Sequence, residues 1–230
     1  VIGGDVRFER GQSELDSKDQ DGLSNTRNFE SIEGSYNAQE AFIDISVPFF
    51  GHMPFTYLLT LDITGRASHF STFGAIYTYR GQLSWAPWRD LLFRGAYSTS
   101  FRAPSINELH RGTHSTQELL EDPCVNWGQG EDVYLQQQCQ AAGLSADFTP
   151  MGNYYRAEVG GNPDLGPELS RTLSFGVVLA PTFIPESMPI AVTFDHYRTW
   201  LTDAIDRISG QAILDNCYTD PALSDYCDFI

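Results

Sequence analysis

The sequence has few basic residues, and only Lys18 among its 14 lysines and arginines is a lysine. Against them stand 30 acidic residues, which gives a net charge of −16 at pH 7. A protein that binds nucleic acid needs a basic surface to neutralise the phosphates. This class of function is therefore excluded, and we expect no nucleic-acid partner.

The sequence also lacks a hydrophobic run that could form a membrane-spanning helix. The longest uncharged stretch covers 45–61, and it contains Pro48, Gly51 and Pro54, which exclude a continuous helix. The first ten residues show neither the basic segment nor the apolar run of a signal peptide. A transmembrane β-strand needs only about 9–11 alternating residues, so a membrane β-barrel stays open.

Motifs of known enzyme chemistry are missing as well. The sequence contains no nucleophile elbow, phosphate-binding loop or zinc-hydrolase motif, so we do not expect an enzyme. The aspartates between 16 and 21 resemble a calcium loop but lack its first and last ligands. Glu108, His110 and His114 would converge on a metal only if they shared a helix. We therefore predict no metal and no cofactor.

Seven segments alternate between apolar and polar residues with a period of two, which is typical of β-strands. These segments are 1–9, 41–47, 57–63, 77–85, 91–101, 172–179 and 189–202. The pattern predicts an all-β fold of meandering antiparallel strands in a sheet that does not close. Six side chains are expected on one apolar side of this sheet: Leu59, Leu61, Leu83, Phe93, Phe175 and Val177. Four charged residues are expected to form ion pairs on the polar side: Asp62, Arg66, Arg80 and Arg94.

The connections between these strands alternate in length and charge. Short, proline-containing turns follow every second strand, while the long connections cover 11–35, 103–167 and 203–230, and the link near 69–74 is the one short exception among the alternate connections. The long connections together carry the whole net charge of −16, so the strands and short turns are neutral. Short turns on one side, long loops on the other and aromatic residues at strand ends are typical of an outer-membrane barrel. A soluble acidic β-sandwich that acts as a binding module is the alternative.

Two motifs carry a resemblance to a known family. FRGAYSTSFRAPSINEL at 93–109 and GGNPDLGPELSRTLSFG at 160–176 together resemble the paired signature of TonB-dependent outer-membrane receptors. The matching positions are Phe101, Arg102, Ala103, Pro104, Asn107, Glu108, Leu109, Asn162, Pro163, Leu165, Pro167 and Glu168. The resemblance implies that 1–230 is a segment of a large transmembrane β-barrel, a fragment without plug domain or terminal strands. It also implies that 103–167 is a long extracellular loop.

The resemblance further implies a function. A receptor of this family sits in the outer membrane of a Gram-negative bacterium and takes up a scarce solute, such as siderophore-bound iron, cobalamin or an oligosaccharide. The energy would come from the TonB complex, which would act through the missing plug region. The expected partners are outer-membrane lipid and lipopolysaccharide, the TonB energy-coupling complex, and a small-molecule or oligosaccharide ligand.

All four cysteines lie in the long connections. An even number of cysteines in extracellular loops indicates disulfides. Three connectivities are possible for Cys124, Cys139, Cys217 and Cys227, and the simplest joins Cys124 to Cys139 and Cys217 to Cys227. The first bond would close a ring, and apolar residues inside and near it could pack as a small lid that first holds an incoming solute: Val125, Trp127, Val133, Tyr134 and Leu135.

Overall fold

The computed structural model describes residues 1–14, 32–49, 55–183 and 190–230, and these divide into two compact units. The first unit contains Val1–Ser13, Ile32–Arg111 and Asn162–Ile205. In the described part of the chain, the second unit contains Glu14, Gly112–Gly161 and Asp206–Ile230. We describe each unit by itself.

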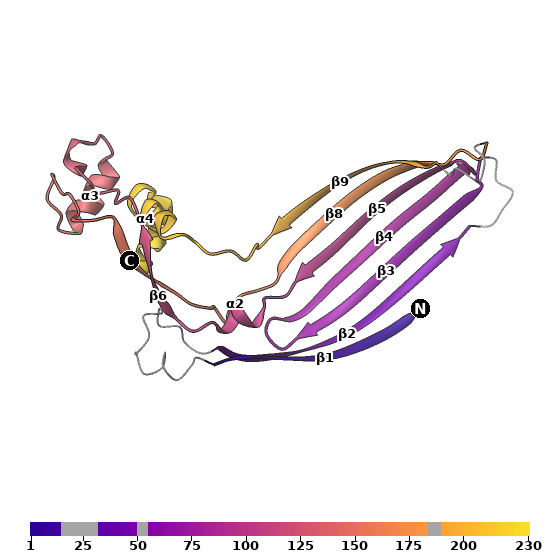
Figure 1. Ribbon diagram of the computed structural model, residues 1–230, viewed down its shortest axis with the longest axis horizontal. Coiled ribbons are helices and arrows are strands. Elements are labelled where there is room, and N and C mark those ends of the chain that lie inside the picture. Colours follow the sequence, from indigo (N-terminus) through magenta and orange to yellow (C-terminus); the bar gives the residue numbers. More distant parts are fainter. Residues whose placement is uncertain (15–31, 50–54, 184–189) are drawn as a thin grey trace. The chain divides into compact units, whose positions relative to one another are not determined.

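The first unit is built on seven antiparallel strands, as the sequence predicts. Their bounds are Ile2–Ser13 (β1), Ile32–Pro48 (β2), Leu58–Phe70 (β3), Gly74–Trp88 (β4), Leu91–Arg102 (β5), Glu168–Leu179 (β8) and Val192–Thr202 (β9). They pair in the order β1-β2-β3-β4-β5-β8-β9 and form one curved layer (Figure 1). The first and last strands do not pair with each other, so the sheet is open.

We call the two edges of this sheet where strands begin and end the loop end and the turn end. The loop end carries the long connections after β1, β5 and β9 and the three-residue turn between β3 and β4. The turn end carries the shorter connections after β2, β4 and β8. The asymmetry that the sequence predicts is therefore present in the fold.

Several strands extend further toward the loop end than the sequence predicts. β2 covers Ile32–Pro48, whereas the alternation predicts only 41–47. The missed part of β2 places Asn37 and Gln39 on the same side as Ile43, because side chains two residues apart share a face. The side that is apolar further along the strand is polar there, while Tyr36 and Ala38 lie on the other side, so the period-two signal of 41–47 does not continue although the ladder of hydrogen bonds does.

Strand register assigns every side chain to one of two faces. On the apolar face, Leu61 of β3 lies opposite Val47 of β2 and Leu83 of β4. The next strands continue this face, with Phe93 of β5 opposite Val177 of β8. All six side chains predicted to share one side do so: Leu59, Leu61, Leu83, Phe93, Phe175 and Val177.

The apolar face is open in the part of the chain that the structure describes. Tyr77 is 73% exposed, Phe194 is 65% exposed and Phe175 is 49% exposed. In a β-sandwich these side chains would pack against a second sheet and be buried. The only other sheet of the described residues has two strands and belongs to the second unit. The sandwich alternative is therefore wrong.

A β-bulge lies near the turn end of β4. The register with β5 shifts between Trp85 and Trp88, at the position of Pro87. Proline has no backbone N–H to donate to a ladder, so it is tolerated where the ladder is interrupted. The shift also brings Trp88 onto the same face as Trp85, since these two residues pair with Leu91 and Phe93.

The second unit has regular structure that the sequence analysis did not predict. It contains the paired strands His114–Leu119 (β6) and Tyr154–Val159 (β7), the helices Val133–Ala141 (α3) and Gly210–Thr219 (α4), and the short 3₁₀ helices Trp127–Gln129 (η1) and Pro221–Phe229 (η2). The N-caps of the two α-helices are Asp132 and Ser209, whose side chains accept hydrogen bonds from the first turn. Among the described residues, no helix has the length and apolar character to span a membrane.

Candidate functional site at the loop end of the polar face

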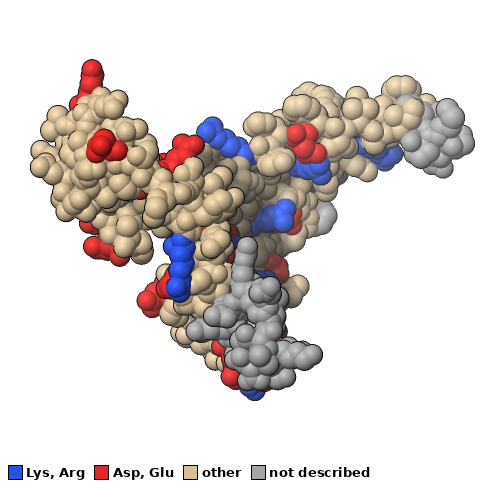
Figure 2. All heavy atoms as spheres, turned by 60° about the vertical axis from the view of Figure 1, so that its left-hand side comes forward, with Lys and Arg blue, Asp and Glu red and all other residues tan. Residues whose placement is uncertain are grey.

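The polar face of the sheet is lined by charged residues that pair across strands. Arg66 lies 2.9 Å from Glu40, and Arg94 lies 2.7 Å from Asp195. The view in Figure 2 likewise shows acidic and basic side chains next to one another at several places. The Arg66–Glu40 and Arg94–Asp195 pairs confirm the ion pairing predicted for Arg66 and Arg94.

The other two residues predicted to form ion pairs have different partners. Asp62 accepts a hydrogen bond of 2.6 Å from the Ser46 hydroxyl, and Arg80 donates to the amide oxygen of Gln82. No ion pair of either residue is found in the described part of the chain. The predicted ion pairing is wrong for these two, and uncharged polar side chains satisfy them instead.

At the loop end, Arg102 joins three segments of the chain, and we call this group the arginine node. The Arg102 guanidinium donates to both oxygens of Glu108 and both oxygens of Glu168, at 2.7–3.0 Å. Glu168 also accepts from the backbone N–H of Ile205, at 2.8 Å. Arg102 thereby joins the end of β5, the helix after it and the start of β8, and Glu168 attaches the segment after β9 as a fourth.

The helix that supplies Glu108 is α2 (Ile106–His110), which Ser105 caps. The Ser105 hydroxyl accepts from the Glu108 N–H, and a Glu108 oxygen accepts from the Ser105 N–H at 2.7 Å. This is a capping box, which satisfies two backbone donors of the first turn. The hydrogen bonds from Arg102, followed by those from Ser105, lower the pKa of Glu108 to about 2.

Two glycines of the sheet make room for α2. A Cβ atom at Gly34 would lie 2.3 Å from Cδ2 of His110 and 2.9 Å from Cγ2 of Ile106. Gly11, which pairs with Gly34 across β1 and β2, faces the same Ile106 side chain. Register places both glycines on the polar face, so α2 packs against that face at its loop end.

The second motif lies next to α2. The Asn162 N–H donates to the backbone oxygen of Glu108 at 2.9 Å, and the Asn162 side chain accepts from the Asp164 N–H. Leu165 closes the turn by donating to the Asn162 backbone oxygen. The structure thus brings the two motifs together at one place, with Pro104 and Leu109 buried beneath them.

Aromatic residues stand at both ends of the apolar face. Trp85 stacks on Phe93 near the turn end, with ring centroids 5.5 Å apart, whereas Tyr79 and Tyr97 lie 6.0 Å apart toward the loop end. From Tyr77 to Trp88, β4 spans about 36 Å, or roughly 26–30 Å across a membrane at a tilt of ~35–45°. This is close to the ~25 Å apolar band of outer-membrane barrels between its two aromatic girdles.

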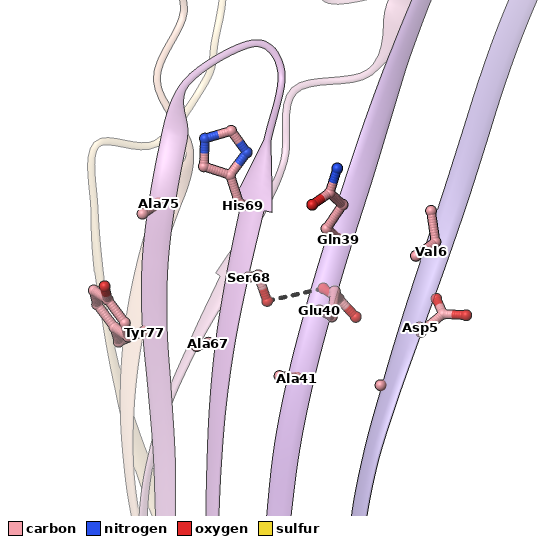
Figure 3. A pocket seen from close by; sticks show the side chains of 11 residues that line it. Asp5, Val6, Gln39, Glu40, Ala41, Ala67, Ser68, His69, Ala75 and Tyr77 are labelled. Atoms are coloured by element: carbon pink, nitrogen blue, oxygen red, sulfur yellow. Dashed lines mark hydrogen bonds between the residues drawn. The ribbon is translucent and has the colours of Figure 1, made fainter.

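A shallow hollow of about 480 Å³ lies on β1–β4, where small side chains replace large ones (Figure 3). Ala41, Ala67 and Ala75 form part of its floor, and His69 and Tyr77 stand at its sides. Ser68, on the opposite face, donates to Glu40 at 2.9 Å. Glu40 points to that opposite face as well, so Gln39 and His69 are the polar side chains that β2 and β3 contribute to the hollow.

The second unit is held by the two predicted disulfides. Cys124 and Cys139 are bonded with their Cα atoms 5.7 Å apart, and Cys217 and Cys227 are bonded with 4.8 Å between theirs. The simplest of the three connectivities is therefore confirmed. Cys124 and Cys139 are completely buried.

The second unit combines two of the long connections, which the sequence analysis treated as separate loops. Glu118 forms an ion pair with Arg207 and accepts from the N–H of Gly210. The Gln211 side chain accepts from the Glu121 N–H at 2.7 Å and donates to the Glu121 backbone oxygen at 2.9 Å. We call this disulfide-bonded unit of 112–161 and 206–230 the cap.

The packing predicted inside the first disulfide ring is only partly present. Tyr134 and Leu135 are half-buried, and the Tyr134 hydroxyl donates to the backbone oxygen of Cys217. Val133 is 64% exposed and Val125 is 39% exposed, so these two residues do not take part in the predicted packing. The reason is that α3 presents Val133 in its first turn to solvent while the Tyr134 side reaches α4.

The described residues contain no group of three side chains suited to hold a metal ion. The calcium-like aspartates between 16 and 21 lie outside the described residues. Glu108 is engaged by Arg102, His110 packs over Gly34, and His114 belongs to β6 in the other unit. Both carboxylates of the arginine node are bound by the Arg102 guanidinium.

The sequence of the whole chain, sheet and cap together, matches a known family. The model for the family "TonB dependent receptor-like, beta-barrel" matches residues 2–226, nearly the entire chain. The chain belongs to this family. The predicted family is therefore confirmed, and the arginine node joins residues that the sequence analysis assigned to the two motifs.

Comparison of this receptor chain with solved structures gives a match to the siderophore receptor PirA from Acinetobacter baumannii. The two are 13% identical over 85% of this chain and 23% of that one, with a TM-score of 0.49. The chain thus spans less than a quarter of the length of this structure. Comparison with curated proteins gives no significant match.

Proposed function

We propose that this chain forms part of the wall and outer surface of an outer-membrane receptor that takes up a scarce solute. The observation that carries the proposal is the division of one antiparallel sheet into two faces. One face is apolar and bounded by aromatic residues, while the other is lined by paired charges. An apolar face toward lipid and a polar face toward a wet lumen are what a membrane barrel needs.

The loop end faces the outside of the cell in this proposal, and 103–167 is an extracellular loop. Its residues 112–161 fold into the cap together with 206–230. The acidic residues of the cap would repel a bare anion, so a neutral solute, a chelated metal or an oligosaccharide suits it better. Siderophore-bound iron, cobalamin and oligosaccharides are the candidate solutes, and the energy for transport comes from the TonB complex.

The test is uptake by cells that carry the full-length gene, compared with cells that lack it. Radiolabelled ferric siderophores, cobalamin and oligosaccharides are supplied one at a time. We expect accumulation of one solute class that requires both the gene and the host TonB protein. Uptake that continues unchanged without TonB would contradict active transport, and no gene-dependent uptake of any of the three classes would contradict the proposed substrates.

A further inference from the structure

Two arginines on the apolar face, Arg171 and Arg198, have no carboxylate partner among the described residues, whereas Arg10 of β1 on the same face pairs with Glu33. Arg171 of β8 shares this face with Leu173 and Phe175, and Arg198 of β9 lies directly opposite Leu173. Arg171 itself lies opposite Trp200. The two arginines are therefore diagonal neighbours across the β8–β9 ladder, with a separation of about 7–8 Å.

Neither of these arginines is neutralised by the described residues. Arg171 is exposed and its side chain has no hydrogen bond, ion pair or ring contact with them. The Arg198 guanidinium lies 4.9 Å from the ring centroid of Trp200, a cation–π contact that leaves its charge unpaired. By contrast, Arg66, Arg94 and Arg102 each bind a carboxylate. On a lipid-facing surface, the positive charges of Arg171 and Arg198 would have no carboxylate among the described residues to balance them.

Both arginines lie near the loop end of the sheet. Arg171 is three residues from the start of β8 and Arg198 is four residues from the end of β9. No acidic residue stands on the apolar face of either strand; its members are Leu169, Arg171, Leu173, Phe175, Val177, Leu179, Val192, Phe194, His196, Arg198, Trp200 and Thr202. A charged side chain costs ~2–4 kcal/mol at the membrane centre but only ~0–1 kcal/mol at the interface. The position thus suits the head-group layer.

A hollow of about 350 Å³ opens beside Arg171. It forms because the pairing of β4 with β5 stops at Arg80 and Ser98, while both strands continue toward the loop end. Its walls include three tyrosine rings and two threonine hydroxyls on the apolar face: Tyr77, Tyr79, Tyr97, Thr99 and Thr202. Aromatic rings and hydroxyls next to a free guanidinium suit a phosphorylated sugar better than a hydrocarbon chain.

We propose that Arg171 and Arg198 bind the phosphate groups of lipopolysaccharide in the outer leaflet, with the sugar rings against the tyrosines and Trp200. This inference rests on the proposed function, because it takes the apolar face to be the lipid face. Guanidinium groups bind phosphate bidentately, and their charge is weakly hydrated, so two of them form a strong site for a diphosphorylated head group.

The test uses the full-length receptor purified from outer membranes in detergent. Native mass spectrometry measures the lipopolysaccharide retained by the wild type, by the double variant R171Q/R198Q, and by Arg80→Gln as the matched control. Arg80→Gln also removes a positive charge from the sheet, but from the polar face. We expect the control to retain as much lipopolysaccharide as the wild type, and the double variant to retain at least about tenfold less.

Added phosphatase-treated lipopolysaccharide and inorganic phosphate identify the source of the phosphate. We expect neither to displace the bound lipid from the wild type. Equal retention by the double variant, or equal binding of the dephosphorylated lipid, would overturn the site. Displacement by inorganic phosphate at similar concentration would replace it with a site for free anions. A wild type that needs no detergent would overturn the proposed function as well, whereas a membrane-inserted receptor without this site would overturn the lipid inference alone.

Discussion

At the scale of single residues, the arginine node holds the loop end of the sheet together through one guanidinium. Arg102 binds two carboxylates, Glu108 and Glu168, whose segments are 60 positions apart in the sequence. Charge-assisted bidentate hydrogen bonds of this kind are about twice as strong as neutral ones. Removing Arg102 would leave the Glu108 and Glu168 carboxylates close together without a positive charge between them. We therefore expect the loss of Arg102 to destabilise the fold more than the loss of either carboxylate alone.

The low pKa of Glu108 predicts a pH-dependent contribution to stability. Because its pKa is about 2 in the fold and 4.5 as the ordinary value, its contribution is complete above pH 4.5 and is lost as the pH falls toward 2. We expect Glu108→Gln to lower the unfolding temperature of the detergent-solubilised receptor at pH 6, and the gap to the wild type to close near pH 2. The control Glu158→Gln, in an exposed pair with Arg156, should change little at either pH.

Gly34 gives a second prediction at this scale. An alanine there would place its Cβ 2.3 Å from His110, so the His110 and Ile106 side chains of α2 must shift from their packing on the sheet. We expect Gly34→Ala to destabilise the receptor by about 1–3 kcal/mol and to speed hydrogen exchange in α2. Gly81→Ala is the control, since nothing lies within 4 Å of a Cβ at Gly81. Equal exchange in the two variants would show that α2 does not depend on this contact.

At the scale of elements, the strands follow from local sequence, because the period of two is a property of each segment alone. The prediction failed where one strand leaves the apolar band, as in β2 before residue 41. It also failed for β6 and β7, whose pairing joins His114 to Val159 across a disulfide-bonded segment. Short strands paired over such a distance leave no local signal. The two receptor motifs were visible in the sequence, but their connection through Arg102 was not.

The facing of the strands predicts how substitutions affect assembly. Phe175 lies near the middle of β8 on the apolar face, and its neighbour Ser174 lies on the polar face. We expect Phe175→Arg to cost about 2–4 kcal/mol in the membrane and to reduce the heat-modifiable receptor in the outer membrane. Ser174→Arg should assemble at the wild-type level. Reduced assembly of Ser174→Arg alone would reverse the assignment of the faces.

At the scale of the whole molecule, the chain consists of two units, the open sheet and the cap. The sheet provides a wall, and the cap is a small disulfide-bonded unit formed by segments on either side of β8 and β9. Local disulfide pairing could be predicted from the cysteine spacing. The co-folding of 112–161 with 206–230 could not, since it rests on contacts such as Glu118 with Arg207 that join distant parts of the sequence.

The first disulfide of the cap predicts a functional effect. A bond that closes a ring of about 15 residues stabilises its segment by about 3 kcal/mol relative to the open chain. We expect Cys124→Ser with Cys139→Ser to weaken binding of the transported solute by about tenfold or more, while the barrel assembles normally. Binding assays and heat-modifiable gel mobility measure the two effects. If solute binding by the assembled variant matches that of the wild type, the cap does not hold the solute.

The most direct test of the account is which end of the sheet faces outward. Met151 lies exposed in the cap, and Arg89 lies exposed in the short turn between β4 and β5. Single variants Met151→Cys and Arg89→Cys of the full-length receptor are treated in intact cells with a membrane-impermeant maleimide. If the loop end faces outward, we expect labelling of Met151→Cys in intact cells, and labelling of Arg89→Cys only after the outer membrane is permeabilised. Labelling of Arg89→Cys but not Met151→Cys in intact cells would contradict an outward-facing loop end.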